Sequence, residues 1–197
     1  MRPILAPLGP YRPFFEQSAS SAPDGESRSV NDTTLRVSYL ELVQAPAAPS
    51  TTRHGAESIA AEKLPVEEYL DLYVRVGEPL HWDQRLKMPR AELIQLLQSP
   101  CSQVYVLRDG DGRALGLCEF ERRLPEIELK NFGLVAAAQG KGLGSWLLRT
   151  ALQHEWRLGP QRIWLHTDNW DHPAAVATYK SAGFRVYRVR DEPPADL

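Results

Sequence analysis

The stretch Gln139-Gly140-Lys141-Gly142-Leu143-Gly144 places three glycines within six residues, between two segments with regular apolar patterns. Residues 126–135 alternate polar and apolar side chains before it, which predicts a strand, and apolar residues recur at helical spacing from 143 to 156 after it. A glycine-rich turn that opens a helix presents free backbone N–H groups at the positive end of the helix dipole. Glycine also lets a ligand approach the backbone. The stretch therefore predicts a pyrophosphate-binding loop.

Three known loops use this physics, and residue spacing distinguishes them. A nucleotide-hydrolase phosphate loop needs Ser or Thr after Gly-Lys, but Lys141 is followed by Gly142. A dinucleotide-binding fingerprint needs a glycine where Ser145 stands. The remaining pattern, Q/R-x-x-G-x-G/A, is matched by Gln139, Gly142 and Gly144. This pattern resembles the acetyl-CoA pyrophosphate loop of the GNAT superfamily.

A second segment carries the same resemblance. The GNAT signature N-x-x-A-x-x-L-Y-x-x-x-G-F runs in register with residues 172–184, and the matching residues are Ala175, Tyr179, Gly183 and Phe184. His172 stands in place of the Asn and Thr178 in place of the Leu. The two motifs together cover residues 126–187, and the element order resembles the family over about residues 35–190.

The rest of the chain predicts alternating strands and helices. Strands are expected at 35–43, 103–107, 114–120, 126–135, 163–167 and 184–189, and helices after Pro65, after Pro89, over 143–156 and over 172–182, with a loop over 44–63. This order predicts an α/β (mixed α+β) class. The resemblance implies a GNAT-like fold, with a mixed, mostly antiparallel sheet flanked by helices. Its fourth and fifth strands, 126–135 and 163–167, are expected to splay apart and admit the cofactor.

The composition of the chain bears on the number of domains, on its partners and on its location. The 197 residues are expected to form one domain over 34–197, preceded by a flexible arm over 1–33 that is rich in Pro, Ser and Gly. A net charge of −2, without a basic stripe, argues against nucleic acid as a partner. No apolar run approaches a membrane span, so a cytoplasmic location is expected. Cys101 and Cys118 are expected to be reduced thiols, and no metal-ligand spacing occurs.

The resemblance implies acetyl-CoA as cosubstrate and assigns residues to it. Those expected to hold the cofactor are Leu134, Val135, Gln139, Gly140, Lys141, Gly142, Leu143, Gly144, Ser145, His172 and Tyr179. A main-chain N–H near Leu134 is expected to bond the thioester oxygen, with Gly133 allowing a local bulge. The resemblance also allows a homodimer.

Acetyl transfer to an amine needs a base for the amine and an acid for the leaving thiolate. Family position favours Glu128 as the base, with its proton affinity raised or with a charge cluster around it, since Glu126 and Lys130 share its strand face. A solvated strand face is an equally good interpretation of these charges. His166 and His172 are the second choices for the base. Tyr179 is expected to be the acid, or else a packing residue of the core.

Aromatic and charged residues at strand ends and in loops predict a pocket for a cationic amine. The candidates for binding the acceptor are Trp82, Glu119, Glu126, Trp164, His166, Trp170, Asp171 and His172. The resemblance implies acetyl transfer to a primary amine by direct attack within a ternary complex. Two alternatives stay open: a non-catalytic acyl-CoA-binding module, and a domain that holds ATP or NAD through the glycine loop.

Overall fold

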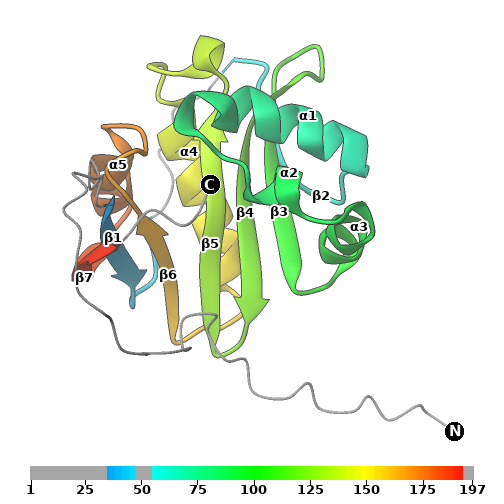
Figure 1. Cartoon of the computed structure of the whole chain (residues 1–197). Coiled ribbons are helices and arrows are strands. Elements are labelled where there is room, and N and C mark those ends of the chain that lie inside the picture. Colours follow the sequence, from blue (N-terminus) through cyan, green and yellow to red (C-terminus); the bar gives the residue numbers. More distant parts are fainter. Residues whose placement is uncertain (1–34, 48–54, 193–197) are drawn as a thin grey trace, which may run out of the picture. The chain divides into compact units, whose positions relative to one another are not determined.

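Seven strands form one mixed sheet in the order β2-β3-β4-β5-β6-β1-β7 (Figure 1). A computed structural model describes residues 35–47 and 55–192. Its elements are, in chain order, β1 Leu35–Leu42, β2 Ser58–Glu62, α1 Val66–Gly77, the one-turn helix η1 Glu78–Leu80, α2 Gln84–Lys87, α3 Arg90–Gln98, β3 Ser102–Arg108, β4 Ala114–Arg123, β5 Glu126–Leu134, the one-turn helix η2 Ala136–Ala138, α4 Leu143–Trp156, β6 Arg162–Thr167, α5 Ala175–Ser181 and β7 Arg185–Glu192. Neighbouring strands are antiparallel except for β5 and β6, which confirms the mixed, mostly antiparallel sheet.

Helices cover both faces of the sheet. α1 and α3 pack on one face around Tyr69, Leu72 and Leu93, whereas α4 and α5 pack on the other around Leu147 and Tyr179. Figure 1 shows α1 in front of the strands and α4 behind them. Each helix buries one stripe, because its apolar residues recur at three- and four-residue steps. The two cores therefore hold the central strands from both sides.

The sheet opens between β5 and β6. Their parallel ladder runs from Glu126↔Arg162 only to Glu128↔Trp164, although β5 continues to Leu134 and β6 to Thr167. The strands beyond that last pair have no ladder between them. This is the expected splay of the fourth and fifth predicted strands.

An irregularity in β5 accompanies the opening. Across β4, Glu119 pairs with Asn131 but Phe120 pairs with Leu129, so Lys130 is the extra residue of a bulge. The bulge expected at Gly133 is therefore wrong by three residues. Gly133 is needed for another reason, because an added Cβ atom would lie 2.5 Å from Cγ1 of Val76 on α1.

Two element predictions need correction. Residues 58–62, expected to be loop, form the edge strand β2, whose residues include a single β-branched side chain and which is held by its ladder to β3. Helix α5 begins at Ala175 rather than at His172, because the His172 side chain accepts the Ala174 N–H at 3.1 Å and holds a turn there. The connection from α1 to α3 also contains η1 and α2. The predicted arm, 1–33, lies outside the described residues.

Both cysteines are free thiols, with Cys101 exposed and Cys118 buried. Burial raises the pKa of the Cys118 thiol. Within residues 35–47 and 55–192, no helix is long and apolar enough to cross a bilayer.

A buried ion pair joins α4 to the sheet. Glu155, with a relative exposure of 0%, accepts hydrogen bonds from Arg122 at 2.7 and 2.6 Å and from the Tyr105 hydroxyl at 2.7 Å. Removing one partner of such a pair leaves an uncompensated charge inside the protein. This carboxylate is therefore part of the fold rather than of a site.

We expect Glu155→Gln to lower the free energy of unfolding by about 3 kcal/mol, because Arg122 loses its buried counter-charge. Glu126→Gln is the matched control: Glu126 also pairs with an arginine, Arg162, at 2.7 Å, but its side chain is 42% exposed. Glu126→Gln should lower the free energy of unfolding by less than about 1 kcal/mol. Urea unfolding measures both, and equal losses would contradict the role of burial.

Candidate active site

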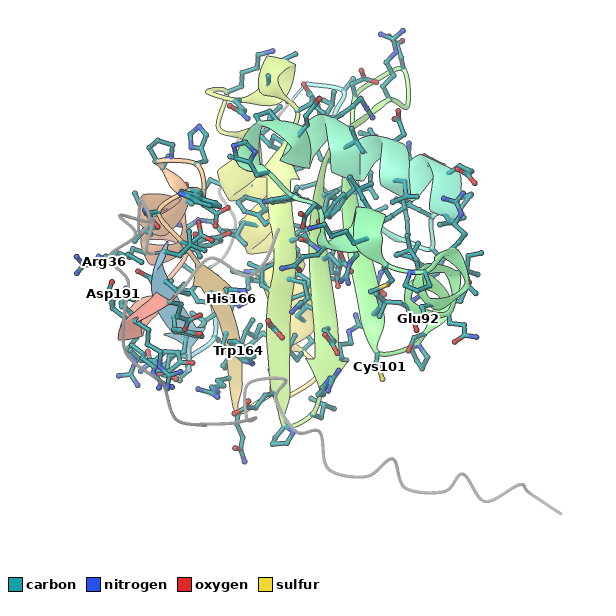
Figure 2. All side chains as sticks on the ribbon, viewed as in Figure 1. Arg36, Glu92, Cys101, Trp164, His166 and Asp191 are labelled. Carbon is teal, nitrogen blue, oxygen red and sulfur yellow. The ribbon has the colours of Figure 1, made fainter. Side chains whose placement is uncertain are left out.

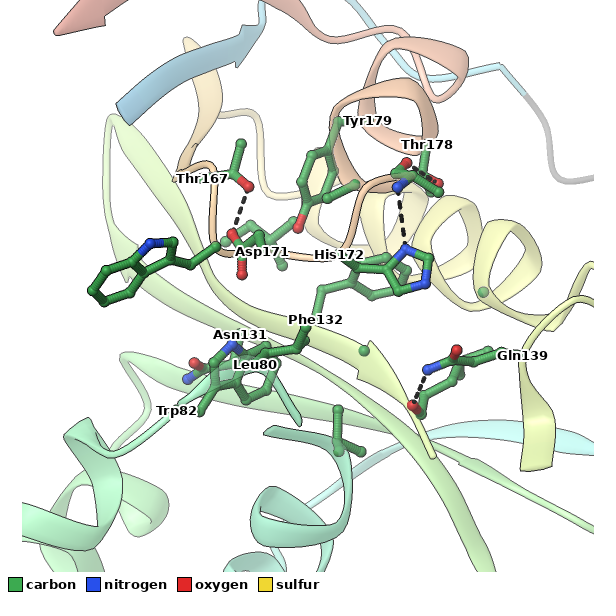
Figure 3. A pocket seen from close by; sticks show the side chains of 18 of the residues that line it. Leu80, Trp82, Asn131, Phe132, Gln139, Thr167, Asp171, His172, Thr178 and Tyr179 are labelled. Atoms are coloured by element: carbon green, nitrogen blue, oxygen red, sulfur yellow. Dashed lines mark hydrogen bonds between the residues drawn. The ribbon is translucent and has the colours of Figure 1, made fainter. Parts of the chain in front are cut away.

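One cavity of about 460 Å³ occupies the opening between β5 and β6. Its wall is formed by the β5 residues from Leu129 to Leu134, the end of β6, the connection after α1, the glycine turn before α4 and the start of α5 (Figure 3). The opening of the sheet therefore connects the glycine turn with the two strand ends in a single space.

The glycine turn is shaped for a ligand that contacts backbone. Gly140 and Gly142 have φ angles of +73° and +78°, which side chains resist. Gly142 is the N-cap of α4, with no side chain bonded to the cap and no acidic residue in the first turn. The N–H groups of Leu143, Gly144 and Ser145 have no acceptor within the helix. The turn can therefore hold an anion with main-chain donors and the helix dipole.

Gln139 ties this turn to the end of β5. Its amide nitrogen donates to the carbonyl oxygen of Leu134 at 3.1 Å. The N–H of Val135, the residue after Leu134, donates to the carbonyl oxygen of Leu115 on β4 at 2.9 Å. Since successive N–H groups of a strand point to opposite edges, the N–H of Leu134 points toward the opening. β5 thus presents an unpaired edge to the cavity.

Tyr179 lies on the cavity wall beside that edge. Its ring is held between Phe132 and Phe184, each with its ring centre 6.0 Å away, and 8% of the residue is exposed. Figure 3 shows its hydroxyl directed into the cavity. Burial, together with the negative charge of Asp171, raises the pKa of the phenol far above its usual value. Tyr179 therefore stays protonated and can donate a proton or a hydrogen bond.

Glu128 is not among the residues that line the cavity, although the next residue, Leu129, is. Its carboxylate is 15% exposed and accepts from the Lys130 ammonium at 2.9 Å, with Nδ1 of His166 at 3.6 Å. Burial acts to raise the Glu128 pKa, but the His166 and Lys130 contacts outweigh it and lower it below 4.5. Of the expected alternatives, a charge cluster fits better than a raised proton affinity, although Glu126 pairs with Arg162 and Lys130 alone of the two strand neighbours bonds to Glu128. His166 does line the cavity, next to Trp164 on β6 (Figure 2).

The cavity brings together many of the predicted site residues. Those on its wall are Trp82, Leu134, Gln139, Gly140, Gly142, Gly144, Ser145, His166, Trp170, Asp171, His172 and Tyr179. Of these, Asp171 accepts from the Thr167 hydroxyl at 2.5 Å. His172 caps the turn before α5 through its ring nitrogen, so the residue that replaces the signature Asn has a structural bond of its own.

The other predicted cofactor residues do not line the cavity. The ammonium of Lys141 turns away and donates to the carbonyl of Ala137 at 2.8 Å. The side chain of Leu143 is buried in the core beneath α4, and Val135 packs against the core clusters. Their side chains are therefore not contacts, although the backbone of 141 and 143 belongs to the turn.

Three predicted acceptor residues also lie elsewhere. Trp164 is not on the cavity wall, and Glu126 pairs with Arg162 at the closed end of β5. Glu119 is 1% exposed and is surrounded by donors: the Tyr69 hydroxyl at 2.6 Å, Arg85 at 2.7 Å and the Asn131 amide at 2.6 Å. Glu119 is the centre of a buried polar network directly behind the cavity.

Sequence reasoning missed several wall residues, among them Asp83, Asn131, Phe132 and Asp168. The bulge at Lys130 changes the alternation that would have assigned Asn131 to a face. Among the described residues, no group of three or more His, Cys, Asp and Glu side chains could hold a metal.

Comparisons with known proteins give the family and the fold of this chain. The model of the acetyltransferase (GNAT) family matches residues 66–184. A mycothiol acetyltransferase of Corynebacterium efficiens is 34% identical over 117 residues, which are 56% of this chain and 38% of that protein. The chain thus spans well under half of this curated relative.

Solved structures share the fold at low sequence identity. A GCN5-related N-acetyltransferase from Sphaerobacter thermophilus has a TM-score of 0.54 at 19% identity, covering 83% of this chain and 54% of that one. Another from Kribbella flavida has a TM-score of 0.55 at 15% identity, covering 84% and 62%. These likenesses concern the fold alone, and they extend over little more than half of each longer chain.

The lowered pKa of Glu128 predicts a pH dependence of stability. Because the folded-state pKa lies below the ordinary 4.5, the carboxylate contributes stability that is complete above that pH and is lost as pH falls through the folded-state pKa. When the pH is lowered from neutral to about pH 3, we expect the free energy of unfolding to fall less in Glu128→Gln than in the unaltered protein. Urea unfolding along a pH series measures this, and parallel curves would contradict it.

Proposed function

The chain belongs to the acetyltransferase (GNAT) family, and on that premise we propose that it transfers an acetyl group from acetyl-CoA to a primary amine by direct attack within a ternary complex. The observation that carries the proposal is a single cavity that joins an anion-binding turn, an unpaired strand edge and a protonated tyrosine. Each of these features matches one part of a thioester cofactor and its reaction.

Coenzyme A fits the two ends of this cavity chemically. Its pyrophosphate would be held by the main-chain donors from Gly140 to Ser145, where the helix dipole of α4 adds to the attraction. Its amide-containing arm would lie along the open edge of β5 and bond to the strand as an added strand does. The thioester oxygen would then be bonded by the N–H of Leu134, which stabilises the charge that forms there.

The reaction requires two proton transfers that cavity residues supply. The amine nitrogen attacks the thioester carbon, the carbon–sulfur bond breaks, and the Tyr179 hydroxyl gives its proton to the departing thiolate. An acceptor that arrives as an ammonium ion first releases one proton to solvent and attacks as the free amine. The proton that its nitrogen loses after the attack passes to His166, which lines the cavity with Nδ1 3.6 Å from the Glu128 carboxylate, and the Tyr179 phenolate regains a proton from His166 by way of solvent. Glu128 then acts by stabilising the charged imidazole, because its lowered pKa makes it a weak base but a constant negative charge.

The acceptor side of the cavity favours a cationic amine. Two carboxylates, Asp168 and Asp171, lie on the wall together with the rings of Trp82 and Trp170, whereas the third wall carboxylate, Asp83, already pairs with Lys87 at 2.7 Å. Carboxylates and aromatic faces both attract an ammonium group. Because the Corynebacterium relatives are named mycothiol acetyltransferases, mycothiol-related substrates are one class to include in a substrate panel.

We expect Gly142→Val to weaken coenzyme A binding at least about tenfold, because the new side chain would occupy the anion site and strain the turn. Gly159→Val is the matched control, since Gly159 also has a positive φ, +72°, but lies in open space after α4. Titration calorimetry measures both affinities. Equal affinity in the two variants would refute the placement of the phosphates.

We expect Tyr179→Phe and His166→Gln each to lower kcat by about 10²-fold or more, with the affinity for coenzyme A unchanged, because each removes a proton-transfer group. Tyr187→Phe is the control, as Tyr187 is an exposed tyrosine of β7 outside the cavity. Thiol release with an amine panel gives the rates. Cofactor binding with no thiol release in the unaltered protein would instead favour the non-catalytic acyl-CoA-binding module.

A further inference from the structure

A single carboxylate of β4, that of Glu119, bonds to side chains from two walls of the cavity. The residue is 1% exposed and accepts from the Tyr69 hydroxyl of α1 at 2.6 Å, from Arg85 of α2 at 2.7 Å and from the Asn131 amide of β5 at 2.6 Å. None of these four side chains has a part in the proposed reaction. Their arrangement around one buried charge therefore needs another explanation.

Arg85 ties the connection after α1 to Glu119. This connection supplies Leu80, Trp82 and Asp83 to the cavity wall, and Arg85 follows two residues after Asp83. Arg85 is 8% exposed, and within the described part of the chain Glu119 is the only carboxylate that pairs with it. Loss of the Glu119 charge would leave a buried guanidinium without its counter-charge. The position of this wall thus depends on Glu119.

The Asn131 amide ties the open strand to the same carboxylate. Asn131 lies directly opposite Glu119 in the ladder between β4 and β5, and the bulge at Lys130 precedes this pair. The bond between amide and carboxylate therefore fixes β5 at the residue where the bulge ends. Asn131 itself lines the cavity, as does the strand from there to Leu134 (Figure 3).

We propose that Glu119 is a positioning residue for acetyl transfer, which holds the wall around Trp82 and the open edge of β5 at a fixed separation. This role rests on the proposed function, in which the amine lies at the first wall and the thioester at the second. A misplacement of about 1 Å between reacting groups can lower a rate about 10²-fold. Glu119 acts only through Arg85 and Asn131, because it is buried and does not line the cavity.

Glu155 provides a matched control with the same chemistry. It is also buried, and it also accepts from one arginine and one tyrosine hydroxyl, those of Arg122 and Tyr105, but neither of these residues lines the cavity. Glu119→Gln and Glu155→Gln each remove a buried charge that pairs with an arginine, so both should lower the thermal unfolding temperature. Only Glu119→Gln should alter the reaction.

Thiol release with an amine panel, at a temperature where both variants are folded, separates the two roles. We expect Glu119→Gln to lower kcat/KM for the amine at least about tenfold, and Glu155→Gln to change it less than about twofold. A similar loss in both variants would mean that Glu119 acts only on stability. That result, or an unchanged kcat/KM in Glu119→Gln, would overturn the positioning role.

Asn131→Ala breaks one link of the network while Glu119 keeps Arg85 and Tyr69, so it tests the role even if Glu119→Gln does not fold. Because the open edge of β5 is then held less firmly, kcat should fall at least about fivefold, with a smaller change in the KM for the amine. Thermal unfolding verifies that the variant is folded. A folded Asn131→Ala with the kcat of the unaltered protein would contradict the link to β5.

Hydrogen exchange gives a readout that does not need turnover. In Glu119→Gln the backbone N–H groups of residues 80–88 and 129–135 should exchange at least about tenfold faster, whereas Glu155→Gln should leave those two segments as they are in the unaltered protein. If no amine releases thiol but exchange responds in this way, Glu119 fixes the two walls and acetyl transfer fails. If thiol is released and neither exchange nor kcat/KM depends on Glu119 more than on Glu155, acetyl transfer stands and the positioning role is refuted.

Discussion

The loss of pairing between β5 and β6 after Glu128 and Trp164 is the constraint on which the site depends. A continuous ladder would satisfy every N–H and C=O group of the two strands and leave no space between them. By separating, the strands expose one edge of β5 and create the cavity. The cost is limited because the two apolar cores hold the strands from both faces. The glycine turn before α4, the open edge of β5 and Tyr179 then lie around one opening.

Periodicity predicted the elements that bury apolar stripes, such as α4 over Leu143–Trp156, whose bounds are the expected ones. It failed where tertiary contacts decide the structure. β2 has little strand propensity and exists because β3 offers it an edge. The bulge at Lys130 is likewise invisible in the pattern of polar and apolar residues, and the start of α5 depends on one bond from a His172 ring.

The end of the cavity proposed for the cofactor could be predicted from sequence because it is local: the glycine turn and the start of a helix are consecutive residues. The end proposed for the acceptor is assembled from β5, the connection after α1 and the turn after β6, which are far apart in the chain. Burial could not be assigned to individual charges either. Glu119 was expected to meet the acceptor and instead lies behind the wall, whereas Asn131, which Glu119 orients, was not singled out. Family resemblance supplied the position of Glu128 but not its lowered pKa.

The buried ion pair of Arg85 with Glu119 separates the attachment of one cavity wall from the residues that the wall exposes. Arg85 fastens the segment that carries Leu80, Trp82 and Asp83 to the middle of the sheet, independently of the residues exposed along it. Substitutions in that segment can thus change the shape and charge of one wall while its attachment point is preserved. Exchange of a few residues of this wall can therefore alter the shape and charge of the cavity without disturbing the glycine turn on the other side.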